Sequence, residues 1–200
     1  MAERRRTAAA RPRRGSPDET RQRLVAAAAE EFNRAGYHGT DSNRLARAAG
    51  YAPGTFYKHF ADKRAILLAA YEAWVTTEWA EVGERLARGG PRDEVARNLV
   101  DMVLRLHRRW RGLRASLRAL IADDPEARAF YRQQRRRQLD LLASMRRGRA
   151  SKRTREADAV FLYTLERVAD AAADGELRDL GLSLEPTVEL LCELVMPLLE

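Results

Sequence analysis

The side chains best suited to chemistry lie between Gly39 and Lys63, and their types suit the binding of DNA rather than catalysis. Thr55 carries a methyl group and a hydroxyl, which can contact a thymine methyl group or a base acceptor in the major groove. Lys58 can reach a base or a phosphate group. Lys63 can bind a phosphate group near a helix N-terminus, where backbone N–H groups and the helix dipole favour an anion.

Two short helices separated by a turn must position these side chains. Thr40 or Asp41 can cap the first helix, and Gly50 stands where that helix must end. Pro53 suits the first turn of a second helix, which we predict to continue over residues 55–60. Such a pair forms a helix-turn-helix, whose second helix places its N-terminal residues in the major groove of DNA.

This stretch resembles the N-terminal domain of the TetR family of bacterial transcriptional regulators. The resemblance covers roughly residues 20–71 and rests on the run Leu45-Ala46-x-x-Ala49-Gly50-x-x-x-x-Thr55-Phe56-Tyr57-x-His59-Phe60-x-x-Lys63. The chain departs from the family pattern at Ala52, where a capping residue is frequent, and at Ser42, where an apolar residue is frequent. The resemblance implies a DNA-binding domain that a long helix joins to a helical effector domain.

The resemblance also implies roles for individual residues. Ser42 and Asn43 stand at the start of the first motif helix, where the family commonly contacts a phosphate or a base edge. Tyr57 and His59 resemble phosphate-facing residues, although this tyrosine could instead fill the core and this histidine could be packed. The predicted DNA-binding residues are Ser42, Asn43, Pro53, Gly54, Thr55, Tyr57, Lys58, His59 and Lys63.

Positive charge is concentrated in the same part of the chain. Of the formal net charge of +8, residues 1–64 contribute +7, from 14 Lys and Arg against 7 Asp and Glu. The other 136 residues contribute +1, from 23 against 22. Because neutralisation of phosphates supplies most nonspecific affinity for DNA, this distribution suits a DNA-binding domain attached to a nearly neutral second domain.

We expect three regions and an all-α fold. Residues 1–15 hold six arginines and no candidate core residue, which predicts a disordered basic tail that either contacts DNA or only adds solubility. Residues 16–62 form the expected helix-turn-helix domain, and residues 63–200 the expected helical domain for ligand binding and dimerisation. Apolar residues recur there at helical spacing, with a break at Gly89-Gly90-Pro91 and a last helix predicted over residues 186–199.

Large aromatic rings on the later helices predict an effector pocket, because apolar pockets between bundle helices are common ligand sites. Rings at helical spacing can equally belong to the core, so this alternative stays open. The expected ligand is small and largely apolar. The candidate pocket residues are Trp74, Trp110, Phe130, Tyr131 and Tyr163.

The last two predicted helices are apolar over wide faces, which something must cover. In the resembled family the final two helices usually pair with those of a second copy, which predicts a homodimer. Burial within one chain is the alternative. The candidate interface residues are Val160, Val188, Leu191, Val195 and Leu198.

Several classes of protein are disfavoured. One cysteine, Cys192, cannot form an internal disulfide, and with only three histidines a metal site is not expected. We find no catalytic pair and no phosphate-binding glycine loop, so we expect neither an enzyme nor a cofactor. No apolar run approaches the roughly 18 residues of a membrane span, and no secretory signal is present, so we expect no membrane partner and a cytoplasmic location.

The sequence therefore predicts a DNA-binding transcriptional regulator. Its expected partners are double-stranded DNA with a palindromic operator, a small-molecule effector and a second copy of the chain. The mechanism that we expect is repression by a homodimer that a ligand releases from the operator. The alternative is an activator or an architectural DNA-binding protein without an effector.

Overall fold

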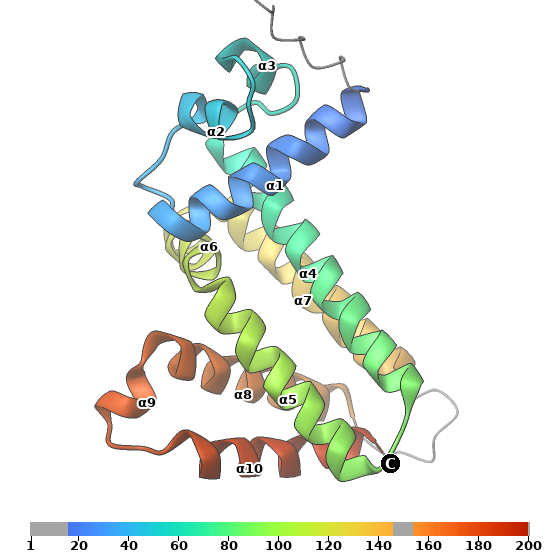
Figure 1. Ribbon diagram of the computed structural model, residues 1–200. Coiled ribbons are helices and arrows are strands. Elements are labelled where there is room, and N and C mark those ends of the chain that lie inside the picture. Colours follow the sequence, from blue (N-terminus) through green and yellow to red (C-terminus); the bar gives the residue numbers. More distant parts are fainter. Residues whose placement is uncertain (1–15, 146–153, 200) are drawn as a thin grey trace, which may run out of the picture.

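The computed structural model describes residues 16–145 and 154–199, and all of its regular elements in these ranges are helical, which confirms the all-α fold. Figure 1 shows three helices at one end of the molecule and a long fourth helix that runs from them into a bundle. These four are α1 (Pro17–Ala35), α2 (Ser42–Ala48), α3 (Pro53–Tyr57) and α4 (Lys63–Arg88). The predicted basic tail, residues 1–15, lies outside the described residues.

The bundle is built from the remaining helices. These are α5 (Arg92–Arg109), α6 (Arg111–Asp123), α7 (Pro125–Met145), α8 (Arg155–Asp174), α9 (Glu176–Asp179), α10 (Leu184–Val195) and a 3-10 turn, η1 (Met196–Leu198). Helix α7 runs beside α4, whereas α8 and α10 pack on α5 (Figure 1). No helix in the described ranges is long and apolar enough to cross a membrane.

Local sequence signals explain where the helices at the DNA-binding end begin. The Ser16 hydroxyl accepts a hydrogen bond from the Glu19 N–H at 3.2 Å, and the Glu19 carboxylate accepts one from the Ser16 N–H at 2.9 Å. Asp41 caps α2 through the Arg44 N–H at 2.9 Å, and Asp62 caps α4. These caps stabilise the N-terminal ends of α1, α2 and α4.

Two predicted helix bounds are wrong. Helix α3 begins at Pro53 as predicted but ends at Tyr57 rather than at Phe60, because the N–H of His59 bonds to the carbonyl of Phe56 and closes a tighter turn. The last helix spans Leu184–Val195 rather than residues 186–199, since Pro197 has no N–H to continue the helical ladder and the chain passes into η1.

The apolar interior consists of two clusters. The first joins α1, α2, α3 and the first half of α4, and it includes Leu113 and Leu117 of α6. The second joins α5, α8 and α10 with Leu142 of α7. Because α4 and α6 contribute side chains to the first cluster, the helix-turn-helix end shares its core with the bundle, and a boundary between residues 62 and 63 remains a prediction.

Helix α6 packs on the C-terminal part of α1 at very close range. A Cβ atom on Gly112 would lie 1.9 Å from the carbonyl oxygen of Asn33, so only glycine fits at this position. The Asn33 side-chain oxygen accepts hydrogen bonds from the N–H groups of Gly112 and Leu113, at 2.9 and 3.2 Å. Its amide donates to the carbonyl of Arg109 at 2.8 Å. One side chain thus ties α1 to the junction of α5 and α6.

Candidate nucleic-acid interface and bundle cavity

The helix-turn-helix is held together by apolar side chains on the inner faces of α2 and α3. Leu45, Ala46 and Phe56 are completely buried. Gly50 has a φ of 80°, a left-handed conformation that glycine adopts without strain, and the following N–H of Tyr51 donates to the carbonyl of Ala46 at 2.9 Å. This confirms that Gly50 ends the first motif helix and opens the turn.

With Phe56 turned inward, the predicted contact residues are distributed over the outer surface of the motif. Asn43, Gly54, Tyr57 and Lys58 are exposed. Tyr57 is 58% exposed, so it does not fill the core, which was the alternative for this residue. The partly buried members of the predicted set are Ser42, Pro53, Thr55, His59 and Lys63.

Lys63 makes contacts within the chain, and its predicted role as a phosphate ligand stays a prediction. Its ammonium group donates hydrogen bonds to the carbonyl oxygens of Tyr37 and Thr40, at 2.8 and 3.1 Å. It also lies 4.2 Å from the centroid of the Tyr37 ring. Because an ammonium group has three N–H donors, two of which are used here, Lys63 fixes the loop between α1 and α2 and keeps one donor for a phosphate group.

Arg47 is a candidate contact that the sequence analysis did not include. It is exposed on α2, and its guanidinium makes no hydrogen bond or ion pair among residues 16–145 and 154–199. Arg44 is also exposed, but its guanidinium pairs with Glu31 at 2.6 Å. Arg47 stands four residues after Asn43, and this spacing places both on one face of α2, a signal that was available in the sequence.

The bundle encloses a cavity of about 300 Å³ between α4, α5, α7, α8 and the C-terminal α10–η1 segment. Most of its wall is aliphatic or aromatic. The residues that line it are Glu78, Trp79, Val82, Gly83, Leu86, Ala87, Leu99, Val103, His107, Leu142, Met145, Phe161, Leu162, Leu165, Glu166, Val195, Leu198 and Leu199.

None of the five aromatic residues predicted to form a pocket lines this cavity. Trp74 is buried against Tyr71, with ring centroids 5.2 Å apart, and Phe130 packs on the other side of Tyr71 at 6.4 Å. Trp110 lies under the guanidinium of Arg109. These rings belong to the first apolar cluster or its margin, and Trp74 and Trp110 line a separate hollow between α1, α4 and α5.

Tyr131 and Tyr163, the other two predicted rings, flank a separate hollow of about 180 Å³. The guanidinium of Arg135 lies between them, 4.7 and 5.3 Å from the ring centroids. The same guanidinium donates to both oxygens of Glu166. The wall of this hollow therefore includes a buried ion pair and is not purely apolar.

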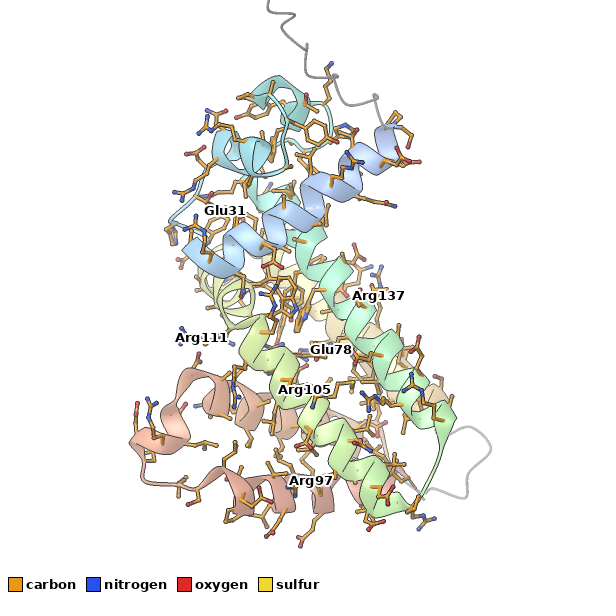
Figure 2. All side chains as sticks on the ribbon, viewed as in Figure 1. Glu31, Glu78, Arg97, Arg105, Arg111 and Arg137 are labelled. Atoms are coloured by element: carbon orange, nitrogen blue, oxygen red, sulfur yellow. The ribbon has the colours of Figure 1, made fainter. Side chains whose placement is uncertain are left out.

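One end of the cavity is polar. Glu78 lies between α4 and α5 in Figure 2, and its Oε1 is 3.9 Å from Nε2 of His107. On the other side of the ring, Nδ1 of His107 is 3.0 Å from Oδ1 of Asp170. Asp170 also accepts from Nε of Arg114 at 2.8 Å. A buried row of side chains thus connects the cavity to α6.

Burial and hydrogen bonding set the protonation states of Glu78, His107 and Asp170. Burial raises the pKa of Glu78 to about 8, because the charged carboxylate is removed from water. It lowers the pKa of His107, which favours the neutral ring. Burial opposes the charge on Asp170 as well, but hydrogen bonds from His107 and Arg114 outweigh it and hold the pKa of Asp170 below its usual value. The described residues contain no group of three or more His, Cys, Asp or Glu side chains that could hold a metal ion.

The predicted interface residues on α10 face the interior of the chain. Val188, Leu191 and Val195 are only 2–3% exposed and pack in the second apolar cluster. Leu198 lines the cavity, and only Val160 is exposed, at 65%. Helical spacing identified an apolar stripe correctly, but α5 and α8 of the same chain cover it.

The sequence model of the bacterial regulatory proteins of the tetR family matches residues 24–70 of this chain. The HTH-type transcriptional repressor AcnR of Corynebacterium efficiens is 27% identical over 177 residues, which cover 88% of this chain and 90% of AcnR. The match to AcnR therefore includes the bundle as well as the helix-turn-helix.

Two solved structures illustrate the similarity of the fold. FadR of Bacillus subtilis, solved in complex with stearoyl-CoA, has a TM-score of 0.62 and 18% identity, over 88% of this chain and 97% of that one. A chain from Saccharomonospora viridis, solved in complex with choline, has a TM-score of 0.68 and 19% identity, over 89% of this chain and 96% of that one.

Proposed function

We propose that this chain, which belongs to the TetR family of bacterial transcriptional regulators, is a repressor that binds a palindromic operator as a homodimer and leaves it when a small molecule enters the bundle cavity. In this proposal residues 16–62 bind DNA, and the helices from residue 63 onward bind the ligand and the second copy. The chain acts by binding rather than by catalysis.

The observation that carries the DNA-binding part is the arrangement of α2 and α3. Phe56 and Leu45 anchor the motif from inside, so that Tyr57 and Lys58 point to solvent beside α2. Tyr57, Lys58, His59 and Arg47 then meet phosphates, while the N-terminal end of α3 approaches the bases. Because α3 is short and begins with Pro53-Gly54, backbone approach and DNA shape contribute to specificity alongside Thr55.

Exposed apolar side chains on the outer surface of α8 and α10 support dimerisation. Val160 and Tyr163 on α8 and Leu184 and Leu190 on α10 are each at least 40% exposed in the single chain. Pairing of these surfaces about a twofold axis would bury them and place two copies of α3 in successive major grooves, about 34–36 Å apart.

A chain of direct contacts supports coupling between the cavity and DNA. His107 lines the cavity and contacts Asp170, which binds Arg114 on α6. The neighbouring N–H of Leu113 binds Asn33 on α1. A ligand that displaces α5 or α8 would thus shift α1 and with it the motif, and a coupling free energy of about 1–3 kcal/mol would suffice to alter operator occupancy.

Similar proteins support a small-molecule effector. FadR of Bacillus subtilis and the chain from Saccharomonospora viridis were solved with stearoyl-CoA and choline, respectively, and share the fold of this chain. The cavity of this chain, at about 300 Å³, has the volume of a site for a small ligand.

Selection of duplexes from a random DNA pool tests the proposal. We expect recovery of an inverted repeat, bound by two copies of the chain, with affinity that falls as salt rises. Lys58→Ala and Arg47→Ala should each weaken binding to all duplexes alike, whereas Thr55→Ala should relax the preference at one base pair. Recovery of no preferred sequence at physiological salt would overturn the proposal.

The second candidate is an activator or an architectural protein without an effector. A reporter fused to the selected operator separates these functions, because a repressor lowers its output and an activator raises it. Footprinting separates a discrete operator from broad coating of DNA. The match to the repressor AcnR favours repression.

A further inference from the structure

The cavity is chemically divided along its length. Glu78 and Ala87 both line it and are nine residues apart on α4, about 13 Å along the helix axis. On α5, which returns along α4, His107 lines the same polar end as Glu78, and Leu99 lies eight residues before it, about 12 Å away. The end around Ala87 and Leu99 is apolar. A ligand that matches this cavity has one polar group and one apolar body.

The polar end presents hydrogen-bond acceptors. Nδ1 of His107 faces the Asp170 carboxylate at 3.0 Å, and because a carboxylate only accepts, Nδ1 carries the proton of the neutral ring. Nε2 is then left with its lone pair. It faces Oε1 of Glu78 at 3.9 Å, too far for a hydrogen bond between them. Nε2 and, once Glu78 is ionised, its carboxylate are therefore two acceptors that converge on one place.

The nearby cations are already occupied. Both terminal nitrogens of Arg135 donate to Glu166, and Arg114 binds Asp170 at 2.8 Å and lies 3.5 Å from Glu166. Arg118 reaches Asp170 from the exposed side. Among the described residues, the only basic side chain with a nitrogen within 4 Å of the Glu78 carboxyl oxygens is His107.

We propose that the cavity binds an amphiphilic amine, whose ammonium N–H groups donate to the Glu78 carboxylate and to Nε2 of His107 while its alkyl or aryl body fills the apolar end. The proposal rests on the cavity being the effector site of the proposed function. The Trp79 side chain also lines the cavity, so an aromatic ring is among the groups available to a bound cation. An anionic headgroup would instead meet the lone pair of Nε2 and, once Glu78 is ionised, a carboxylate, and neither of these donates a hydrogen bond to an anion.

The protonation of Glu78 is consistent with this assignment. Burial raises its pKa to about 8, so that the empty cavity holds a neutral carboxyl group near neutral pH. A bound ammonium group would stabilise the carboxylate and release the proton. The volume of about 300 Å³ has room for on the order of ten non-hydrogen atoms at about 30 Å³ each.

Three probes of nearly equal size test the headgroup: octylamine, 1-octanol and octanoate. Calorimetric titration of the full chain at pH 8 should show octylamine binding at least tenfold more tightly than the other two. Glu78→Gln keeps the size of the side chain and should remove the preference for octylamine over 1-octanol. Glu84→Gln, on the exposed surface of α4, is the matched control and should keep the preference.

The outcomes separate this inference from the proposed function. If octanoate or 1-octanol binds as tightly as octylamine, or if Glu78→Gln retains the amine preference, the amine assignment is wrong and the cavity remains an effector site for another class. If no probe binds, both the assignment and the effector cavity fail, whereas DNA binding is judged separately by the duplex selection. If octylamine binds selectively without changing operator affinity, the assignment stands and ligand release fails.

Discussion

Glu78 shows how far the surroundings alter a single residue. In the sequence it is one of many acidic residues on an amphipathic helix, and in the structure it is buried between α4 and α5 at the cavity (Figure 2). A carboxyl group in such a place resists ionisation because the protein interior solvates charge poorly. The chemical character of the cavity depends on this one group.

We expect the free energy of unfolding of Glu78→Gln, relative to that of the unmodified chain, to increase as pH rises. The pKa of Glu78 is about 8 in the folded chain, above its usual 4.5, so the folded state binds more protons between these values. The stability of the unmodified chain therefore falls as pH rises from about 5 to 8, by up to about 1.4 kcal/mol per pH unit from this group. Urea unfolding of both proteins at several pH values measures the difference. A constant difference across this range would contradict the prediction.

Lys63 and Lys58 should respond differently to removal of their charges. Lys63→Ala deletes two hydrogen bonds from an ammonium group to loop carbonyls, so we expect a loss of about 2 kcal/mol in the free energy of unfolding. Lys58→Ala should leave stability nearly unchanged but reduce the slope of log affinity against log salt by about 0.9. Denaturant unfolding and DNA titrations at several salt concentrations separate the two. Equal reductions of the salt slope would show that Lys63 also binds a phosphate group.

At the scale of elements, the contact between α1 and α6 connects the two ends of the molecule. Gly112 permits the close approach, and Asn33 fixes it with three hydrogen bonds. Helix α4 also belongs to both ends, since its first half packs in the first apolar cluster and its second half lines the cavity. Movement in the bundle therefore has two routes to the helix-turn-helix.

We expect Asn33→Ala to weaken the coupling between ligand and DNA. The substitution removes the hydrogen bonds that tie α1 to the α5–α6 junction. The coupling free energy between effector and operator should therefore be smaller by about 1–2 kcal/mol than in the unmodified chain. Operator titrations with and without saturating ligand measure this quantity. Asn98→Ala, at an exposed position on α5, is the control and should keep the full effect. Undiminished release in Asn33→Ala would exclude this contact as a route.

At the scale of the whole molecule, the residues that would form the interface of the proposed homodimer differ from those predicted from the sequence. Most of the predicted interface side chains are buried within one chain, so a dimer must use the outer residues of α8 and α10 instead. These include Val160, Tyr163, Leu184 and Leu190, which are each at least 40% exposed in the single chain.

We expect Leu190→Arg to prevent dimerisation without unfolding the chain. Leu190 is 65% exposed, so an arginine can remain solvated in the monomer but would be buried and unpaired in a dimer. Light scattering at micromolar concentration should show a monomer, and the affinity for a complete operator should fall by at least tenfold. Leu141→Arg on α7, also at an exposed site, is the control. Dimers that persist in Leu190→Arg would place the interface elsewhere.

Local chemistry determined much of this protein from the sequence alone. Ser16, Asp41 and Asp62 cap helices because their side chains reach backbone N–H groups two or three residues away, and Gly50 ends α2 because it alone adopts a left-handed φ without strain. The all-α fold and the helix-turn-helix follow from these signals and from helical spacing. Such features need no knowledge of distant residues.

Tertiary structure decided which partner each face meets. Val188 and Leu190 lie two residues apart on one apolar helix, yet the first is buried by α5 and α8 and the second is exposed. The five aromatic residues predicted to form a pocket lie outside the cavity, because ring size says nothing about where helices separate. Lys63 and Glu78 acquired their roles from carbonyls and side chains more than 20 residues away. Periodicity identifies a face, but only the packing of distant helices determines what covers it.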